Sequence, residues 1–116
     1  MTLHVTPPML EAAYTLLQST PPFSGWKLPL ADDVEFHVIR SPTIRGEYDT
    51  AGDVHIIRIS SAVIGTLQEL LSTMAHEICH MRQQIVAPDD KSHHGARFQK
   101  YADSVCKMHC FDRKAF

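Results

Sequence analysis

Two histidines, His76 and His80, stand four positions apart in the stretch TMAHEICHM, and Glu77 directly follows the first of them. Residues four apart on an α-helix lie on the same side, one turn from each other, so the two imidazoles can bind one metal ion. Glu77 would lie about 100° around that helix from His76, where its carboxylate can reach a water bound to the metal. The spacing therefore predicts a zinc site in which Glu77 acts as the general base.

A third ligand would make this an open, catalytic zinc site, with three protein nitrogens and one water. The compact H-E-x-x-H-x-x-G-x-x-H form is excluded, because Gln83 and Val86 occupy the positions of its glycine and last histidine. A downstream glutamate ligand is excluded as well, since no glutamate follows Glu77. The ligand types that remain downstream are four aspartates and three histidines, His93, His94 and His109.

The adjacent histidines His93 and His94 would point in different directions from a helix. On a helix that begins near residue 93 or 94, one stripe at helical spacing is mostly apolar and contains His94, Phe98, Tyr101, Val105 and Met108. A second stripe is mostly charged and contains His93, Arg97, Lys100, Ser104 and Lys107. We therefore expect His94 to point inward as the third ligand and His93 to point into water, with Gly95 allowing close approach of the backbone.

The elements that must position these side chains include an N-terminal helix and a small sheet. Thr6 before two prolines resembles an N-cap, and apolar residues at helical spacing continue to about Ser19. Residues 20–33 are rich in proline and glycine and predict a connection. Alternating apolar residues predict strands over 34–39 and 54–60, with a short strand over 46–50 between them. Three antiparallel strands are the economical arrangement.

Two further helices complete the expected fold. Thr66 and Glu69 have the spacing of a capping box, which predicts a helix through the H-E-x-x-H motif to about Ile85. Pro88 breaks that pattern, and a last helix should run from residue 93 or 94 to about His109. The expected fold class is α+β. A single domain over residues 1–116 would combine an N-terminal helix, a three-stranded antiparallel sheet and two helices that carry the ligands.

Charge is distributed unevenly along the 116 residues, whose formal net charge is −2. Residues 1–90 contain five basic and eleven acidic residues, whereas residues 91–116 contain six basic and two acidic residues. The net charge excludes a uniformly basic nucleic-acid binder but leaves a cationic C-terminal quarter. Two interpretations fit that quarter, a solvated helix face and a weak, non-specific contact with DNA phosphates through Arg97, Lys100 and Lys107.

The sequence contains neither a signal-peptide pattern in MTLHVTPPML nor an apolar run long enough for a membrane span. Its three cysteines, Cys79, Cys106 and Cys110, do not make an even disulfide framework. We therefore expect a cytoplasmic monomer without a membrane partner. Two half-buried thiols at a helix end are the favoured interpretation of Cys106 and Cys110, over a second metal bound together with His109.

Both histidine motifs resemble those of a known family. The stretches ELLSTMAHEICHMRQQ and SHHGARFQKYA resemble the SprT-like zinc metallopeptidase domain, which includes the Spartan proteases. The family pattern is H-E-x-x-H on one helix and a histidine in H-G-x-x-F at the head of a later helix, matched here by residues 76–80 and 94–98. The resemblance covers nearly the whole chain. It implies a compact, zincin-like α+β peptidase with one zinc ion, whose Spartan branch cleaves proteins crosslinked to DNA.

The chain departs from larger relatives, many of which carry a C-terminal zinc ribbon of paired C-x-x-C motifs. Its tail contains only Cys106 and Cys110, so we expect no ribbon.

The predicted function is hydrolysis of a protein or peptide substrate, with DNA-associated proteins as one substrate class. The alternative is a non-catalytic, nucleic-acid-associated adaptor in which the metal only ties two helices together. Tyr48 and Tyr101 are candidates for steadying the oxyanion.

Overall fold

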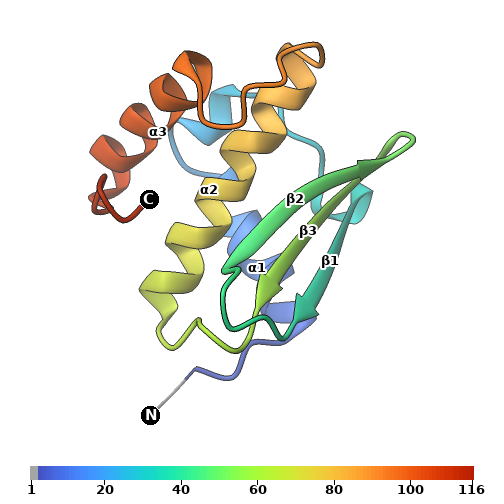
Figure 1. Cartoon of the computed structure of the whole chain (residues 1–116), viewed down its shortest axis with the longest axis vertical. Helices are drawn as coiled ribbons and strands as arrows, with labels where there is room; N and C mark the ends of the chain where they lie inside the picture. Colours follow the sequence, from blue (N-terminus) through green and yellow to red (C-terminus); the bar gives the residue numbers. More distant parts are fainter. Residues whose placement is uncertain (1–2) are drawn as a thin grey trace.

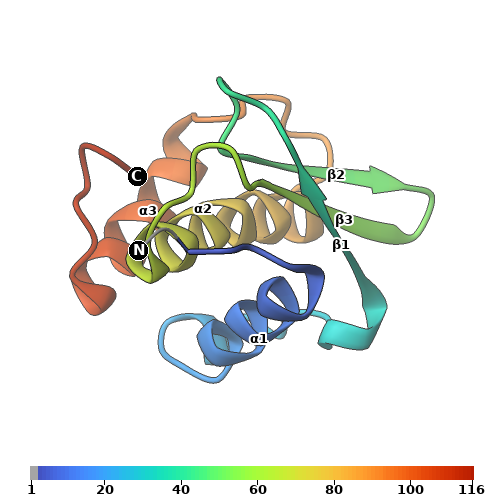
Figure 2. The same cartoon turned by 90° about the horizontal axis from the view of Figure 1, so that it is seen from below.

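The computed structural model describes residues 3–116, so the first two residues of the amino-terminal stretch considered above lie outside it. Its elements in chain order are α1 (Pro7–Gln18), two short 3-10 helices (Phe23–Gly25 and Ala31–Asp33), β1 (Val34–Ile39), β2 (Gly46–Ala51), β3 (Val54–Ser60), α2 (Leu67–Val86) and α3 (Ala96–His109). Helix α2 runs through the middle of the molecule, with the sheet on one side and α3 on the other (Figures 1 and 2). Helix α1 packs against both α2 and β1.

The strands form a mixed sheet in the order β1-β3-β2. Strands β2 and β3 are antiparallel and are joined by a turn at Gly52, whose φ of 61° suits glycine. Strand β1, however, runs parallel to β3, with Val34 opposite His55. The prediction of a purely antiparallel sheet was therefore wrong. Alternating apolar residues determine which face of a strand is buried, but they carry no information on the direction of its neighbour.

The connection between β1 and β2 explains the mixed order. Residues 40–45 leave the end of β1, cross the end of β3 and enter β2, so that β3 lies between the other two strands. Ser60, at the end of β3, is fully buried and holds this connection. Its hydroxyl donates to the carbonyl of Ser41 (2.7 Å) and accepts from the backbone N–H of the same residue (3.0 Å).

Helix α2 begins at the predicted capping box. The side chain of Thr66 accepts a hydrogen bond from the backbone N–H of Glu69 (3.1 Å), and the Glu69 carboxylate accepts one from the N–H of Gly65 (3.2 Å). The apolar face of α2 is part of the core cluster and contains Leu70, Met74 and Ile78. Because this face is fixed against the core, the rest of α2 presents the H-E-x-x-H motif toward β2 and α3. No helix in residues 3–116 is both long and apolar enough to cross a membrane.

Helix α3 begins later than predicted, at Ala96, with Gly95 as its N-cap residue. The carboxylate of Asp90 accepts hydrogen bonds from the N–H (3.0 Å) and the hydroxyl (2.6 Å) of Ser92, and this turn delays the helix. His94 therefore precedes the helix and does not belong to its apolar stripe. The predicted apolar stripe was wrong at both ends, because His94 is exposed and Met108 is 57% exposed.

Candidate metal centre

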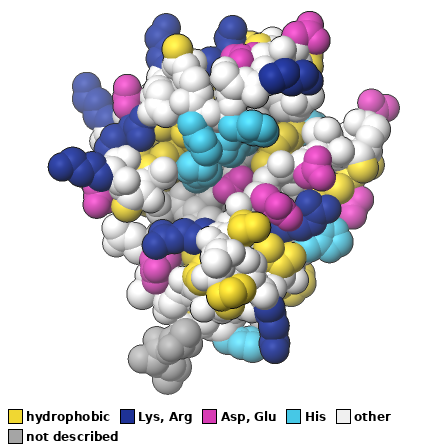
Figure 3. All heavy atoms as spheres, viewed as in Figure 1, with side chains coloured by type: hydrophobic (Ala, Val, Ile, Leu, Met, Phe, Trp, Pro, Cys, Tyr) yellow, Lys and Arg dark blue, Asp and Glu magenta, His cyan; other side chains and the backbone are white. Residues whose placement is uncertain are grey.

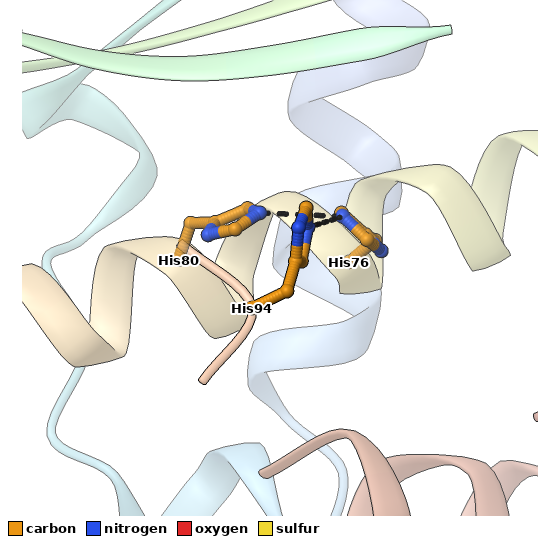
Figure 4. Close-up of side chains that lie close together, drawn as sticks. All are labelled: His76, His80 and His94. Carbon is orange, nitrogen blue, oxygen red and sulfur yellow. Dashed lines mark hydrogen bonds between the residues drawn. The ribbon is translucent and has the colours of Figure 1, made fainter. Parts of the chain in front are cut away.

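Three histidine side chains meet between α2 and the segment that leads to α3 (Figure 4). The Nε2 atom of His76 lies 3.3 Å from that of His80 and 3.4 Å from that of His94. Ligand nitrogens about 3.4 Å apart are what a tetrahedral ion with bonds of about 2.1 Å requires. The donor set and its spacing therefore fit one metal ion held by all three residues.

The third histidine is placed by hydrogen bonds to its flanking backbone. Gln83, one turn beyond His80 on α2, is buried and donates from Nε2 to the carbonyl of Ser92 (2.8 Å). Gln99, on α3, donates from Nε2 to the carbonyl of His94 itself (2.9 Å). Sequence reasoning did not assign a role to either glutamine. For Gln83, the only available signal was its position one turn after the predicted ligand His80.

Phe98 forms an apolar support for the whole cluster. Its ring centroid lies 4.5 Å from that of His80, 4.8 Å from that of His94 and 5.0 Å from that of His76. Phe98 is only 1% exposed, so it connects the three imidazoles to the core. The side chain matches the last position of the H-G-x-x-F pattern, and its contacts give that position a physical role.

Burial and mutual repulsion keep two of the imidazoles neutral. Burial, followed by the neighbouring His94, lowers the pKa of His76 to about 4. Burial, followed by His76 and His94, lowers the pKa of His80 to about 3. A metal ion binds the neutral form of histidine, so at neutral pH no proton has to leave these two ligands before an ion binds.

Glu77 lies beside the cluster and is 4% exposed. Burial, with a further contribution from the Glu47 carboxylate, raises the pKa of Glu77 to about 8. In the protein without a cation, its carboxyl group is therefore protonated at neutral pH. A divalent cation at the three histidines would favour the carboxylate form, because an opposite charge nearby lowers the pKa of an acid.

A cavity of about 500 Å³ opens over the histidines. Figure 3 shows histidine side chains gathered in a hollow on this face of the molecule. One wall is formed by five consecutive residues of β2, from Gly46 to Thr50, and the other by the segment before α3. A Cβ atom on Gly46 would lie 3.1 Å from the Thr73 side chain of α2 and 3.0 Å from that of Ile59, so glycine allows β2 to approach α2 closely.

The two tyrosine candidates lie in different surroundings. Tyr48 borders the cavity, and its hydroxyl lies 2.6 Å from Nδ1 of His55. Burial raises the pKa of Tyr48 and lowers that of His55, so the phenol donates this hydrogen bond to a neutral imidazole. Tyr101 instead packs against Trp26, with ring centroids 5.2 Å apart. Of the two tyrosines, only Tyr48 lines the cavity over the histidines.

The other candidate residues lie outside the cluster of three histidines. His93 is exposed, as predicted, although its ring centroid is 6.2 Å from that of His80. Cys106 is buried and Cys110 is exposed, so the expectation of two half-buried thiols was wrong. His109 contacts the carbonyl of Pro21 through Nε2 (2.9 Å). Within residues 3–116, these three side chains do not form a second group with metal-ligand spacing.

The cationic face predicted on α3 is smaller than its sequence suggested. Arg97 Nε lies 3.6 Å from the Asp90 carboxylate, so part of its charge is neutralised. Lys100 and Lys107 are exposed on the outside of α3. Two lysines and one paired arginine remain as potential phosphate contacts.

A family model matches most of this chain. Residues 26–114 match the family model described as the SprT-like family. The matched part covers most of the chain and includes the sheet, α2, α3 and all three histidines of the cluster. A search of curated proteins finds no match to this chain.

Proposed function

The chain belongs to the SprT-like family, and from this premise we propose that it is a zinc-dependent metallopeptidase with a zincin-like active site. The observation that carries the proposal is the meeting of the His76, His80 and His94 nitrogens beside a buried Glu77. Three protein ligands leave a fourth position open, which is the pattern of catalytic rather than structural zinc. Imidazole ligands also suit other divalent metals, and among these metals we propose zinc.

The proposed mechanism assigns each residue one task. Zinc, when bound, supplies a Lewis acid that polarises the substrate carbonyl and makes water more acidic. Glu77 accepts the proton of the attacking water and then delivers it to the leaving amine. Its burial at the cavity wall keeps the carboxylate free of competing hydration, so that the proton is transferred within the site. His76, His80 and His94 remain neutral ligands throughout.

A protein or peptide substrate is supported by the position of β2. This strand lies at the edge of the sheet, and five of its consecutive residues line the cavity over the histidines. The backbone N–H and C=O groups of an edge strand can pair with an extended peptide. Such a peptide would run along β2 and cross the metal centre with its backbone accessible to Glu77.

The test compares Glu77→Gln with wild type. The variant should retain one zinc ion per chain, measured by elemental analysis, and should lose cleavage of an unfolded protein such as casein. His94→Ala should lose zinc and cleavage together. Cleavage by Glu77→Gln at the wild-type rate would overturn the proposed mechanism.

DNA-associated proteins are the proposed substrate class, supported by the exposed Lys100 and Lys107 on the outside of α3. The same two lysines favour a second candidate function, a nucleic-acid-associated adaptor in which the metal has only a structural role. The adaptor predicts that chelation unfolds the protein and that no peptide bond is cleaved. Casein and a DNA-bound protein, tested side by side, separate the two functions.

A further inference from the structure

The segment after α3 returns to the metal centre. Cys110 ends α3 in the left-handed conformation, with φ of 59°, and the chain then reverses. The ring of Phe111 stacks on that of His109, with centroids 5.5 Å apart, and also lies 6.2 Å from that of Phe116. Phe116 in turn lies 5.2 Å from the ring of His76. We name residues 111–116 the strap.

Arg113 fastens the strap to α3. Its Nε donates to the carboxylate of Asp103 (2.7 Å), and its Nη2 donates to Oε1 of Gln99. The amide nitrogen of the same Gln99 donates to the carbonyl of His94. A continuous chain of hydrogen bonds therefore links Arg113, through Gln99, to the backbone of the third histidine.

The strap also reaches the first histidine. Nε2 of His76 is turned toward His80 and His94. The ring of Phe116 packs against the His76 ring, with centroids 5.2 Å apart and an angle of 53° between the ring planes. Groups that contact a metal ligand from outside fix the direction of its ring and so affect metal affinity. Phe116 restricts the direction of the His76 ring through this packing.

We propose that the strap is a positioning device for the metal ion, in which Phe116 orients His76 while Arg113 holds His94 through Gln99. Phe116 and Arg113 are positioning residues, because they act on the ion through its ligands. The inference rests on the metal binding that the proposed function requires, and it is independent of whether a peptide bond is cleaved.

The experiment compares Arg113→Met with Lys114→Met. Both substitutions remove one positive charge from the strap, but Lys114 is exposed and its side chain has no ion pair in residues 3–116. Zinc affinity would be measured by competition with a chromophoric chelator, and ligand geometry by the visible spectrum of the cobalt-loaded protein. Loss of a direct outer partner of a metal ligand weakens binding by about 10–100-fold, and Arg113 acts through Gln99, so we expect a loss at the lower end of this range, about 10-fold. Arg113→Met should show this loss together with an altered cobalt spectrum, whereas Lys114→Met should match wild type.

The metal-free thermal midpoint of each variant separates positioning from folding. Unchanged zinc affinity in Arg113→Met would overturn the proposal. Should that variant not fold, Phe116→Ala gives the same test, since it removes only the ring that packs on His76; unchanged affinity there would also overturn it. If the wild-type protein never cleaves casein but Arg113→Met still weakens zinc binding, the peptidase function is refuted. The positioning role proposed for the strap would then still hold.

Discussion

His94 Nε2 lies 3.4 Å from His76 Nε2, although the two residues are 18 positions apart and His94 precedes its helix. A ligand on a connecting segment is only as well placed as the backbone around it. Here that backbone is held from α2 by Gln83 and from α3 by Gln99. The two anchors come from different helices, so the separation of α2 and α3 directly sets the position of the third nitrogen.

Gln83→Met should therefore weaken zinc binding although Gln83 is not a ligand. The substitution keeps the side-chain length but removes the hydrogen bond to Ser92, so the segment that carries His94 loses its anchor on α2. We expect about 10-fold weaker zinc binding, measured by chelator competition. Gln84→Met is the matched control, because this neighbouring residue lines the same cavity without a hydrogen bond to that segment. Equal affinity in the two variants would show that the anchor is not required.

The burial of Glu77 should make the metal-free protein less stable at high pH. The pKa of this carboxyl is about 8 in the folded protein, against an ordinary value of 4.5. The folded state therefore binds more protons than the unfolded state between these values, and the free energy of unfolding falls as pH rises through that window. Glu77→Gln removes the titration.

Above pH 8, the metal-free Glu77→Gln variant should melt at least about 4 °C higher than wild type, the shift that 1 kcal/mol produces in a domain of this size. Below pH 4.5 both proteins carry a neutral group at this position, and the difference should nearly vanish. Calorimetry across this range, with a chelator present, measures the effect. A difference independent of pH would exclude titration of Glu77 as its cause.

Gly46→Ala should destabilise the protein where β2 meets α2. The added Cβ would lie 3.0–3.1 Å from two side chains and from the backbone oxygen of Arg58, so the strand would have to move. Overpacking of this kind costs about 1–3 kcal/mol. Gly25→Ala is the control, since its Cβ would meet no atom within 4 Å. Urea unfolding of both variants gives the comparison, and equal midpoints would contradict the close approach.

The DNA contact proposed for α3 should depend on its two exposed lysines. The double variant Lys100→Glu/Lys107→Glu should bind DNA more weakly, and its affinity should depend less steeply on salt, by about two units of slope for two lost phosphate contacts. Arg40→Glu, an exposed charge reversal after β1, serves as the control. Binding measured by fluorescence anisotropy over a range of salt decides the question. An unchanged slope would remove the main support for a DNA contact.

The parts of the fold that could be predicted from sequence are those with a local signal. The capping box at Thr66 and the apolar periodicity after it located α2, because both depend on residues within a few positions of one another. The direction of β1 relative to β3 depends on how residues 40–45 cross the sheet, and neither strand records that path. The expectation of a purely antiparallel sheet was wrong for this reason.

The candidate site also contains some residues that a local pattern predicted and others that it did not. His76 and His80 share one helix, so their spacing alone predicted that they meet. His94 was placed by resemblance to a family and by a helical phase, and its actual position follows from the turn at Asp90 and from two glutamine anchors. The contact of Phe116 with His76 was not predicted, because no periodic pattern relates a ligand to a distant residue after the last helix.

The placement of two ligands on α2 and one before α3 has a consequence for how the protein unfolds. An ion held at this point joins the two helices into one cooperative unit, so that α3 cannot open without releasing the ion. The folded state would gain about 2.7 kcal/mol when free zinc is 100 times its dissociation constant. Without the ion, α3 is held by its packing, its glutamine anchors and the contact of His109 with Pro21, and its amide hydrogens should exchange before those of α2. The supply of metal would then determine whether the last quarter of the chain resists proteolysis.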